Sequence, residues 1–177
     1  MSGTDAIGAG VTQRPAPASL PATGAKPPHS GAPNQLSRPV RVFLVDDQAI
    51  VLKGLHLFLS RQADLEVCGE AADAVEAWQG IAAERPQVAV VDLRLGPEDC
   101  IDLLDRLHRE LPEVRVLVFS MHGGAFHVRR ALQAGASGYV TKQEGTKKVV
   151  EAIHRLMQGR PYLSDAALSS LGALGGA

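Results

Sequence analysis

The stretch Val88-Ala-Val-Val-Asp92-Leu-Arg-Leu95 decides how the rest of the chain is interpreted. Its first four residues form a short unbroken apolar run, which is typical of a strand buried on both faces of a parallel sheet. The run ends in a carboxylate, Asp92, at the carboxyl end of the predicted strand. In open α/β sheets, ligands bind at this edge. The stretch therefore predicts a parallel sheet with an acidic group at its ligand-binding edge.

Strand and helix patterns alternate along the chain from residue 40 onward. Runs typical of strands occupy residues 41–45, 65–69, 88–91, 114–119 and 137–140. Apolar residues at helical spacing follow them at 50–61, 75–82, 101–107, 126–132 and 149–157. This alternation predicts the α/β class, with a five-stranded parallel sheet and helices on both faces. Five strands in a domain of about 120 residues match the flavodoxin-like strand order 2-1-3-4-5.

The composition divides the chain into three parts. Residues 1–39 hold seven of the eleven prolines and almost no large apolar side chains, so they are predicted to be a disordered tail rich in Pro, Ala and Gly. Residues 40–160 carry the alternating pattern and are predicted to be the folded domain. Residues 161–177 are a short C-terminal extension, with one weak helix expected at 164–171.

Charge and cysteine content exclude several classes of function. The chain has 18 basic and 19 acidic residues and a net charge of -1, so bulk electrostatics favour neither nucleic-acid nor membrane binding. Cys68 and Cys100 form no CxxC metal motif and no disulfide framework. The sequence has no apolar run near 18 residues and no signal-peptide pattern. These features predict a cytoplasmic protein that does not bind membranes.

Polar residues follow the other predicted strands at their carboxyl ends. Strands one and three are neighbours in the predicted order, about 4.8 Å apart, so Asp46 and Asp47 meet Asp92 at one edge. Ser120 and Lys142 reach the same edge from strands four and five. Three carboxylates in contact repel one another, and Mg²⁺ relieves this repulsion while keeping several water ligands. With a lysine and a hydroxyl beside it, an Asp can act as nucleophile and carry a phosphoryl group.

The motifs around these residues resemble the receiver domain of bacterial two-component response regulators. The resemblance covers roughly residues 40–160 and is carried by Val45-Asp46-Asp47, Val91-Asp92, Phe119-Ser120 and Tyr139-Val-Thr-Lys142. The spacing also matches, with 45 residues from Asp47 to Asp92, 28 more to Ser120 and 22 more to Lys142. Three further segments resemble the LuxR/NarL/FixJ-type subgroup, whose receivers precede a DNA-binding helix-turn-helix: Gly69-Glu-Ala-Ala-Asp73, Arg130-Ala-Leu-Gln-Ala-Gly135 and Tyr162-Leu-Ser164.

The resemblance implies a set of ligands for Mg²⁺. Asp47 is the direct acidic ligand and Asp46 supports it. Asp92 is both a ligand and the residue that is phosphorylated. The backbone carbonyl of Arg94 is a further ligand. All four positions lie just after the first and third predicted strands, so the resemblance and the predicted strand order place the metal at the same edge of the sheet.

The resemblance also implies how the phosphoryl group is held and detected. Asp92 is the phosphoacceptor and Lys142 pairs with the phosphoryl group. Ser120 and Tyr139 are switch residues: Ser120 moves toward the phosphoryl group, and the Tyr139 ring enters the space that Ser120 leaves. Phosphorylation is then expected to alter the face formed by the fourth helix, fifth strand and fifth helix.

Three features of the sequence depart from the usual pattern of the family. Receivers usually have Met-Pro two to four residues beyond the acceptor and a Gly near Cys100, whereas this chain has Leu95-Gly96-Pro97. This departure bears on where the Arg94 carbonyl lies. Gln143 replaces the proline that often follows the lysine, as is common in the LuxR-associated subgroup. Met121 follows Ser120 where a smaller residue is frequent, which suggests narrower access to the acyl phosphate.

The sequence therefore predicts a phosphoacceptor receiver. It takes a phosphoryl group from a sensor histidine kinase or a phosphotransfer protein onto Asp92 with Mg²⁺, and it then switches its protein contacts. Such a receiver takes part in its own phosphorylation and dephosphorylation and is not otherwise an enzyme. The resemblance allows a homodimer on phosphorylation, and DNA binding by this chain is not expected. The alternative is an N-terminal fragment or truncated form of a LuxR-type DNA-binding transcription regulator.

Other classes fit the residues less well. Haloacid-dehalogenase-like phosphatases also phosphorylate an Asp after a strand, but they need a second Asp two positions later, where this chain has Arg94. Ser120 near His122 could form a nucleophile and base, but no Gly-x-Ser-x-Gly elbow surrounds the serine. A dinucleotide-binding domain would have a Gly-rich turn after the first strand, which here leads into Asp46-Asp47. That acidic pair could also serve only as a helix N-cap.

Overall fold

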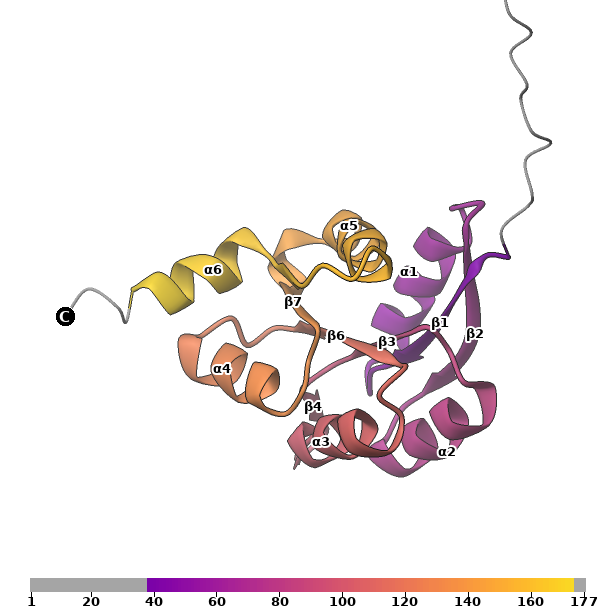
Figure 1. Ribbon diagram of the computed structural model, residues 1–177, viewed down its shortest axis with the longest axis horizontal. Coiled ribbons are helices and arrows are strands. Elements are labelled where there is room, and N and C mark those ends of the chain that lie inside the picture. The colour runs from indigo at the N-terminus through magenta and orange to yellow at the C-terminus, as the bar shows by residue number, and fades with distance from the viewer. Residues whose placement is uncertain (1–37, 174–177) are drawn as a thin grey trace, which may run out of the picture. The chain divides into compact units, whose positions relative to one another are not determined.

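The computed structural model describes residues 38–173, and within this range six parallel strands form the central sheet (Figure 1). The strands are β1 (Val40–Val45), β2 (Leu65–Ala71), β3 (Val88–Val91), β6 (Arg115–Ser120), β7 (Gly138–Thr141) and β8 (Tyr162–Leu163). Their order is β2-β1-β3-β6-β7-β8. The first five strands therefore confirm the predicted order, and β8 adds a strand beyond β7. The predicted tail, residues 1–39, lies outside the described residues except for its last two positions.

Helices cover both faces of this sheet, as predicted (Figure 1). They are α1 (Ala49–Leu59), α2 (Ala74–Glu84), α3 (Ile101–Glu110), α4 (Ala125–Gln133), α5 (Thr146–Met157) and α6 (Asp165–Gly172). Val42 and Leu44 of β1 belong to the core cluster with α1 and α5, while Phe43 and Val45 belong to the cluster with α2, α3, α4 and α6. Alternate residues of one strand thus supply two separate cores. No helix in residues 38–173 has the length and apolar character to cross a bilayer.

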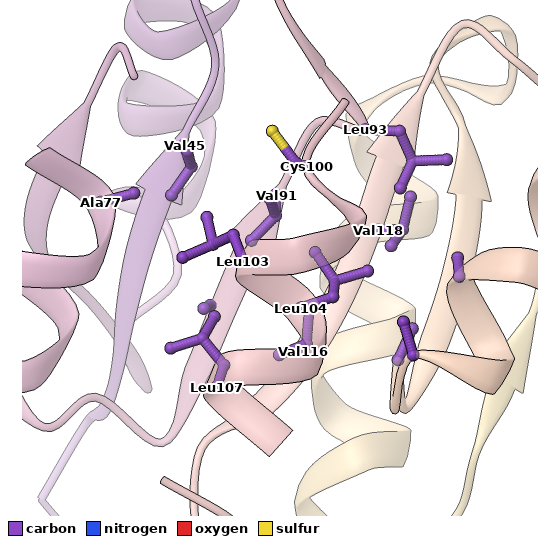
Figure 2. Packing of buried hydrophobic residues seen from close by; sticks show 14 of the residues in the cluster. Val45, Ala77, Val91, Leu93, Cys100, Leu103, Leu104, Leu107, Val116 and Val118 are labelled. Carbon is purple, nitrogen blue, oxygen red and sulfur yellow. The ribbon is translucent and has the colours of Figure 1, made fainter. Parts of the chain in front are cut away.

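The apolar residues of helix α3, which recur at helical spacing in the sequence, pack against the sheet (Figure 2). Leu103, Leu104 and Leu107 lie on one side of this helix and are buried against the sheet. Val91 of β3 and Val116 of β6 belong to the same cluster. Burying a leucine side chain contributes about 1.5–3 kcal/mol. These three leucines therefore hold α3 against β3, the strand that leads to Asp92.

The ends of helix α2 follow the capping signals in the sequence. The Asp73 side chain accepts a hydrogen bond from the Glu76 amide at 2.8 Å and so caps the start of the helix. The helix ends at Glu84, two residues before Pro86. Arg85 takes a left-handed conformation with φ 47°, which turns the chain toward β3.

Strand β8 and the hairpin that follows Asp92 were not predicted. The segment Arg94–Asp99 forms a hairpin of β4 (Arg94–Leu95) and β5 (Glu98–Asp99) with Gly96 at φ 61° in its turn. Strand β8 pairs with β7 through Gly138 opposite Tyr162. A Cβ at Gly138 would lie 2.9 Å from the Tyr162 carbonyl oxygen, so the glycine permits this close approach.

The predicted helix at 164–171 is confirmed as α6, which lies beside α4 and β7 (Figure 1). Ala167 is completely buried there, and Leu163 and Leu171 are partly buried against the same core. The last part of the described chain, from β8 to α6, is therefore packed onto the sheet and its helices.

Two helical glycines should respond oppositely to substitution by alanine. Gly54 of α1 has open space around it, so Gly54→Ala should raise the free energy of unfolding by about 0.5–1 kcal/mol. A Cβ at Gly80 of α2 would overlap the buried Phe43 ring. Displacing that ring costs about 1–3 kcal/mol, so Gly80→Ala should be destabilising overall. Urea denaturation measures both values, and equal stabilisation by the two changes would contradict this packing.

Candidate functional site

Three carboxylates meet at the carboxyl edge of the sheet. Asp46 and Asp47 follow β1 and Asp92 follows β3, and one oxygen from each lies within 4.8 Å of the others. The parallel pairing of β1 with β3 causes this, because Val45 lies opposite Val91 and the Asp92 amide donates to the Val45 carbonyl at 2.9 Å. Asp46 and Asp92 are buried, whereas Asp47 is exposed. The predicted convergence of these residues is therefore present.

Lys142 connects the two buried carboxylates. Its Nζ lies 2.6 Å from Asp46 Oδ2 and 2.5 Å from Asp92 Oδ2, and its side chain is only 7% exposed. Lys142 follows β7, so its long side chain reaches across the end of β6 to β3. Burial acts to lower the pKa of Lys142, but the hydrogen bonds to Asp46 and Asp92 outweigh it and raise that pKa above its usual value. The amine is thus held as a cation.

The carboxylate of Asp46 is fixed by two donors. Its Oδ1 accepts the Gln48 amide at 3.0 Å, and its Oδ2 faces Lys142. Burial raises the pKa of Asp46 above its usual value, with the bonds from Lys142 and Gln48 opposing this effect. The cost of burying this charge is therefore only partly offset by its neighbours.

Backbone amides of the segment after Asp92 also reach the cluster. The Arg94 amide donates to Asp92 Oδ1 at 3.3 Å, and the Gly96 amide donates to Asp47 Oδ2 at 2.8 Å. The β4–β5 hairpin thus carries an N–H donor to Asp47. The contact shown for Arg94 is made by its amide, and a role for its carbonyl as a ligand stays a prediction.

The two predicted switch residues lie together inside the fold. Ser120 ends β6, is fully buried, and accepts the His122 amide on Oγ at 3.4 Å. Tyr139 is also fully buried, and its hydroxyl donates to the His122 carbonyl. Burial and then the negative charge of Asp92 raise the pKa of Tyr139 far above its usual value, so the hydroxyl keeps its proton. The ring lies in the core, and the movement of the two switch residues stays a prediction.

The departures from the family pattern have definite places in the structure. Gly96 and Pro97 lie in the hairpin turn, and Cys100 is buried where α3 begins. Gln143 lies in η1 (Lys142–Glu144), a single 3-10 turn. The Met121 side chain is 55% exposed, and its predicted effect on access to Asp92 stays a prediction.

The sequence did not indicate several backbone groups near the site. The Gly96 amide and the His122 carbonyl contact predicted site residues, but main-chain groups leave no residue-type signature. The Gly-Pro pair at 96–97 was the one available signal for a turn beside Asp92. A turn there would have placed backbone donors near the carboxylates.

The fold and this cluster define an α/β domain with an acidic site at the carboxyl edge of its parallel sheet, and comparison with known proteins identifies its family. A model of the response regulator receiver domain matches residues 42–154. The chain therefore belongs to the response regulator receiver domain family, and its relatives are response regulators of the LuxR/NarL type.

Individual relatives agree with this assignment. The chain is 38% identical over 136 residues to the DNA-binding transcriptional activator DevR/DosR of Mycobacterium tuberculosis, and 30% identical over 133 residues to the oxygen regulatory protein NreC of Staphylococcus epidermidis. Each alignment covers 75% of this chain and 61% of the relative, so the chain matches less than two thirds of their length.

Solved structures show the same fold. A LuxR-family response regulator from Aurantimonas sp. SI85-9A1 has a TM-score of 0.74 and 33% identity, covering 77% of this chain and 98% of that one. The receiver domain of the response regulator NarL from Mycobacterium tuberculosis has a TM-score of 0.66 and 31% identity, covering 70% and 100%.

Replacing Lys142 tests the electrostatic balance of the cluster. Lys142→Met leaves Asp46 and Asp92 buried without their shared cation, and removing one partner of a buried ion pair costs about 3–5 kcal/mol. We expect the free energy of unfolding without added Mg²⁺ to fall by about 3 kcal/mol, measured by urea denaturation at pH 7. Lys147→Met, at an exposed position on α5, is the control and should change it by less than about 0.5 kcal/mol. Equal effects would show that the bridge has little energetic importance.

Proposed function

We propose that this chain is a phosphoacceptor receiver that takes a phosphoryl group on Asp92 from a histidine kinase or phosphotransfer protein. The observation that carries the proposal is the single Lys142 amine placed between Asp46 and Asp92, next to the exposed Asp47. This arrangement supplies a nucleophilic carboxylate, a fixed positive charge beside it and an open acidic side. Phosphoryl transfer requires mainly positioning and charge neutralisation, which these groups can provide.

The donor set fits Mg²⁺. It consists of carboxylate oxygens only, from Asp46, Asp47 and Asp92, and hard oxygen ligands are those that Mg²⁺ prefers. Three carboxylates face one lysine here, so the cluster retains excess negative charge that a divalent cation would neutralise. When bound, Mg²⁺ would neutralise charge on the incoming phosphoryl oxygens. The Arg94 carbonyl is proposed as a further ligand, in keeping with the resemblance.

The chain's own residues would perform the transfer as follows. A carboxylate oxygen of Asp92 forms a bond to phosphorus while the bond from phosphorus to the donor's histidine nitrogen breaks. The Lys142 ammonium, already 2.5 Å from Asp92, pairs with the phosphoryl oxygens. Ser120, buried at the neighbouring strand end, would donate its hydroxyl to the same group. The chain takes part in its own phosphorylation and dephosphorylation in this scheme.

The response would pass through the residues around Tyr139. A movement of Ser120 changes the His122 segment, whose amide contacts Ser120 and whose carbonyl holds the Tyr139 hydroxyl. Tyr139 is packed in the same core as Val128 and Ala131 of α4. A change there would alter the α4–β7–α5 face, which we propose as the surface for a partner or for a homodimer formed on phosphorylation. We propose a cytoplasmic location for this reaction.

A longer DNA-binding regulator is the second candidate function. It is favoured by the alignment, which covers only 61% of relatives such as the DNA-binding transcriptional activator DevR/DosR. We propose that the 177 residues alone do not bind DNA, because their net charge of -1 includes no excess of basic residues to bind the DNA phosphates. A salt-resistant, sequence-selective gel shift by the purified chain would contradict this.

Phosphorylation should depend on Asp92 alone. Incubation with acetyl phosphate and Mg²⁺, followed by borohydride trapping and mass spectrometry, should locate one modified residue at position 92. Asp92→Asn should abolish the modification, while Asp105→Asn, at an exposed carboxylate on α3, should leave it unchanged. Full modification of Asp92→Asn would refute the proposed acceptor.

Magnesium binding should depend on Asp47. Asp47 is the exposed carboxylate of the cluster, so Asp47→Ala should weaken Mg²⁺ binding by about tenfold or more, equivalent to at least about 1.4 kcal/mol. Isothermal titration calorimetry with MgCl₂ measures this, with Asp105→Ala as the control. Unchanged affinity in Asp47→Ala would place the cation elsewhere.

A further inference from the structure

The C-terminal segment, defined here as residues 162–172, is attached to the fold at several points. Strand β8 pairs with β7, and α6 lies against α4 and β7 (Figure 1). Ala167 is completely buried in the core cluster that also contains Tyr139. The segment therefore covers the β7 edge and part of α4, on the face that the proposed function uses for output.

The start of α6 is capped by a residue from another element. The Ser164 side chain makes no capping hydrogen bond to its own helix. Instead, the Glu144 carboxylate accepts the Ala166 amide on Oε1 at 3.2 Å, and its other oxygen accepts the Thr141 hydroxyl at 2.6 Å. A helix of eight residues is marginal by itself. Its first turn therefore depends on this external carboxylate, which the positive end of the helix dipole also favours.

The same turn of chain reaches the phosphoacceptor site. Lys142 is the first residue of η1 and Glu144 is the last. Lys142 contacts Asp92, and Glu144 accepts the Ala166 amide of α6, so this single turn contacts both the site and the helix. A second connection runs through the backbone, since the Ser164 amide donates to the Tyr139 carbonyl at 2.9 Å. Gly145, at φ 82°, follows the turn and gives the backbone freedom to move.

We propose that Glu144 is a positioning residue that couples the phosphorylation state of Asp92 to the docking of the C-terminal segment. This inference rests on the proposed function. Phosphoryl oxygens lie farther from the sheet than the Asp92 carboxylate, so Lys142 must move outward to pair with them. The η1 turn moves with it and draws Glu144 away from the Ala166 amide. The C-terminal segment then loosens, and the β7 edge and α4 become accessible to a partner.

Coupling of this kind is reciprocal. If phosphorylation weakens the docking of the segment, then weakening the docking must favour the phosphorylated state by the same factor. Loss of a helix cap changes a local equilibrium by about five- to tenfold. Glu144→Ala should therefore increase the affinity for beryllofluoride, a mimic of the phosphoryl group, by a factor of that size at most.

Hydrogen exchange of the full 177-residue chain with Mg²⁺ tests the proposal. Amides of Asp165–Gly172 should exchange about five- to tenfold faster in Glu144→Ala than in the unchanged chain. Glu144→Gln retains an accepting oxygen and should lie between the two. Glu110→Ala is the control, because Glu110 pairs with Arg106 within α3, and it should leave the exchange unchanged. Beryllofluoride should accelerate exchange in the unchanged chain and have little further effect in Glu144→Ala.

Fluorine NMR of the same samples separates two kinds of failure. If bound beryllofluoride is detected and the exchange of Asp165–Gly172 in the unchanged chain stays the same, the coupling through Glu144 is wrong. The coupling is equally wrong if Glu144→Ala exchanges no faster than Glu110→Ala. If no bound beryllofluoride is detected, the proposed function itself fails, and the inference that rests on it falls with it.

Discussion

Two buried carboxylates share one buried ammonium group, and much of this structure follows from that constraint. Asp46 and Asp92 are adjacent because β1 and β3 pair in parallel, and the long Lys142 side chain reaches both from the end of β7, which lies two strands from β3. With Asp47 beside them, the cluster holds three acidic groups and one basic group. We propose that this excess negative charge favours a divalent cation, and that the cation and Lys142 together would neutralise an incoming phosphoryl group.

The position of Lys142 also connects the site to the rest of the fold. The lysine begins η1, and two residues later Glu144 caps α6. Ser120 and Tyr139 both contact the backbone of His122: Ser120 accepts a hydrogen bond from its amide, and Tyr139 donates one to its carbonyl. A change of charge at Asp92 therefore has two short physical routes to the α4 side of the molecule, one through η1 and one through the His122 segment.

Much of this could be predicted from the sequence, for identifiable reasons. The order of the first five strands and the meeting of Asp46, Asp47 and Asp92 follow from apolar periodicity and from the rules of parallel sheets. Strand β8 and the β4–β5 hairpin could not be predicted, because two-residue strands carry no periodicity. The role of Glu144 depends on where α6 packs, which is a tertiary property that local sequence does not encode. The Arg94 carbonyl and the switching motion stay predictions.

A crystal structure of the chain with Mg²⁺ and beryllofluoride would test the central claim most directly. The account predicts one fluoroberyllate on Asp92, one Mg²⁺ bound by oxygens of Asp47 and Asp92 with Asp46 beside it, and Lys142 Nζ in contact with a fluorine atom. An unmodified Asp92, or a cation bound away from this cluster, would contradict it.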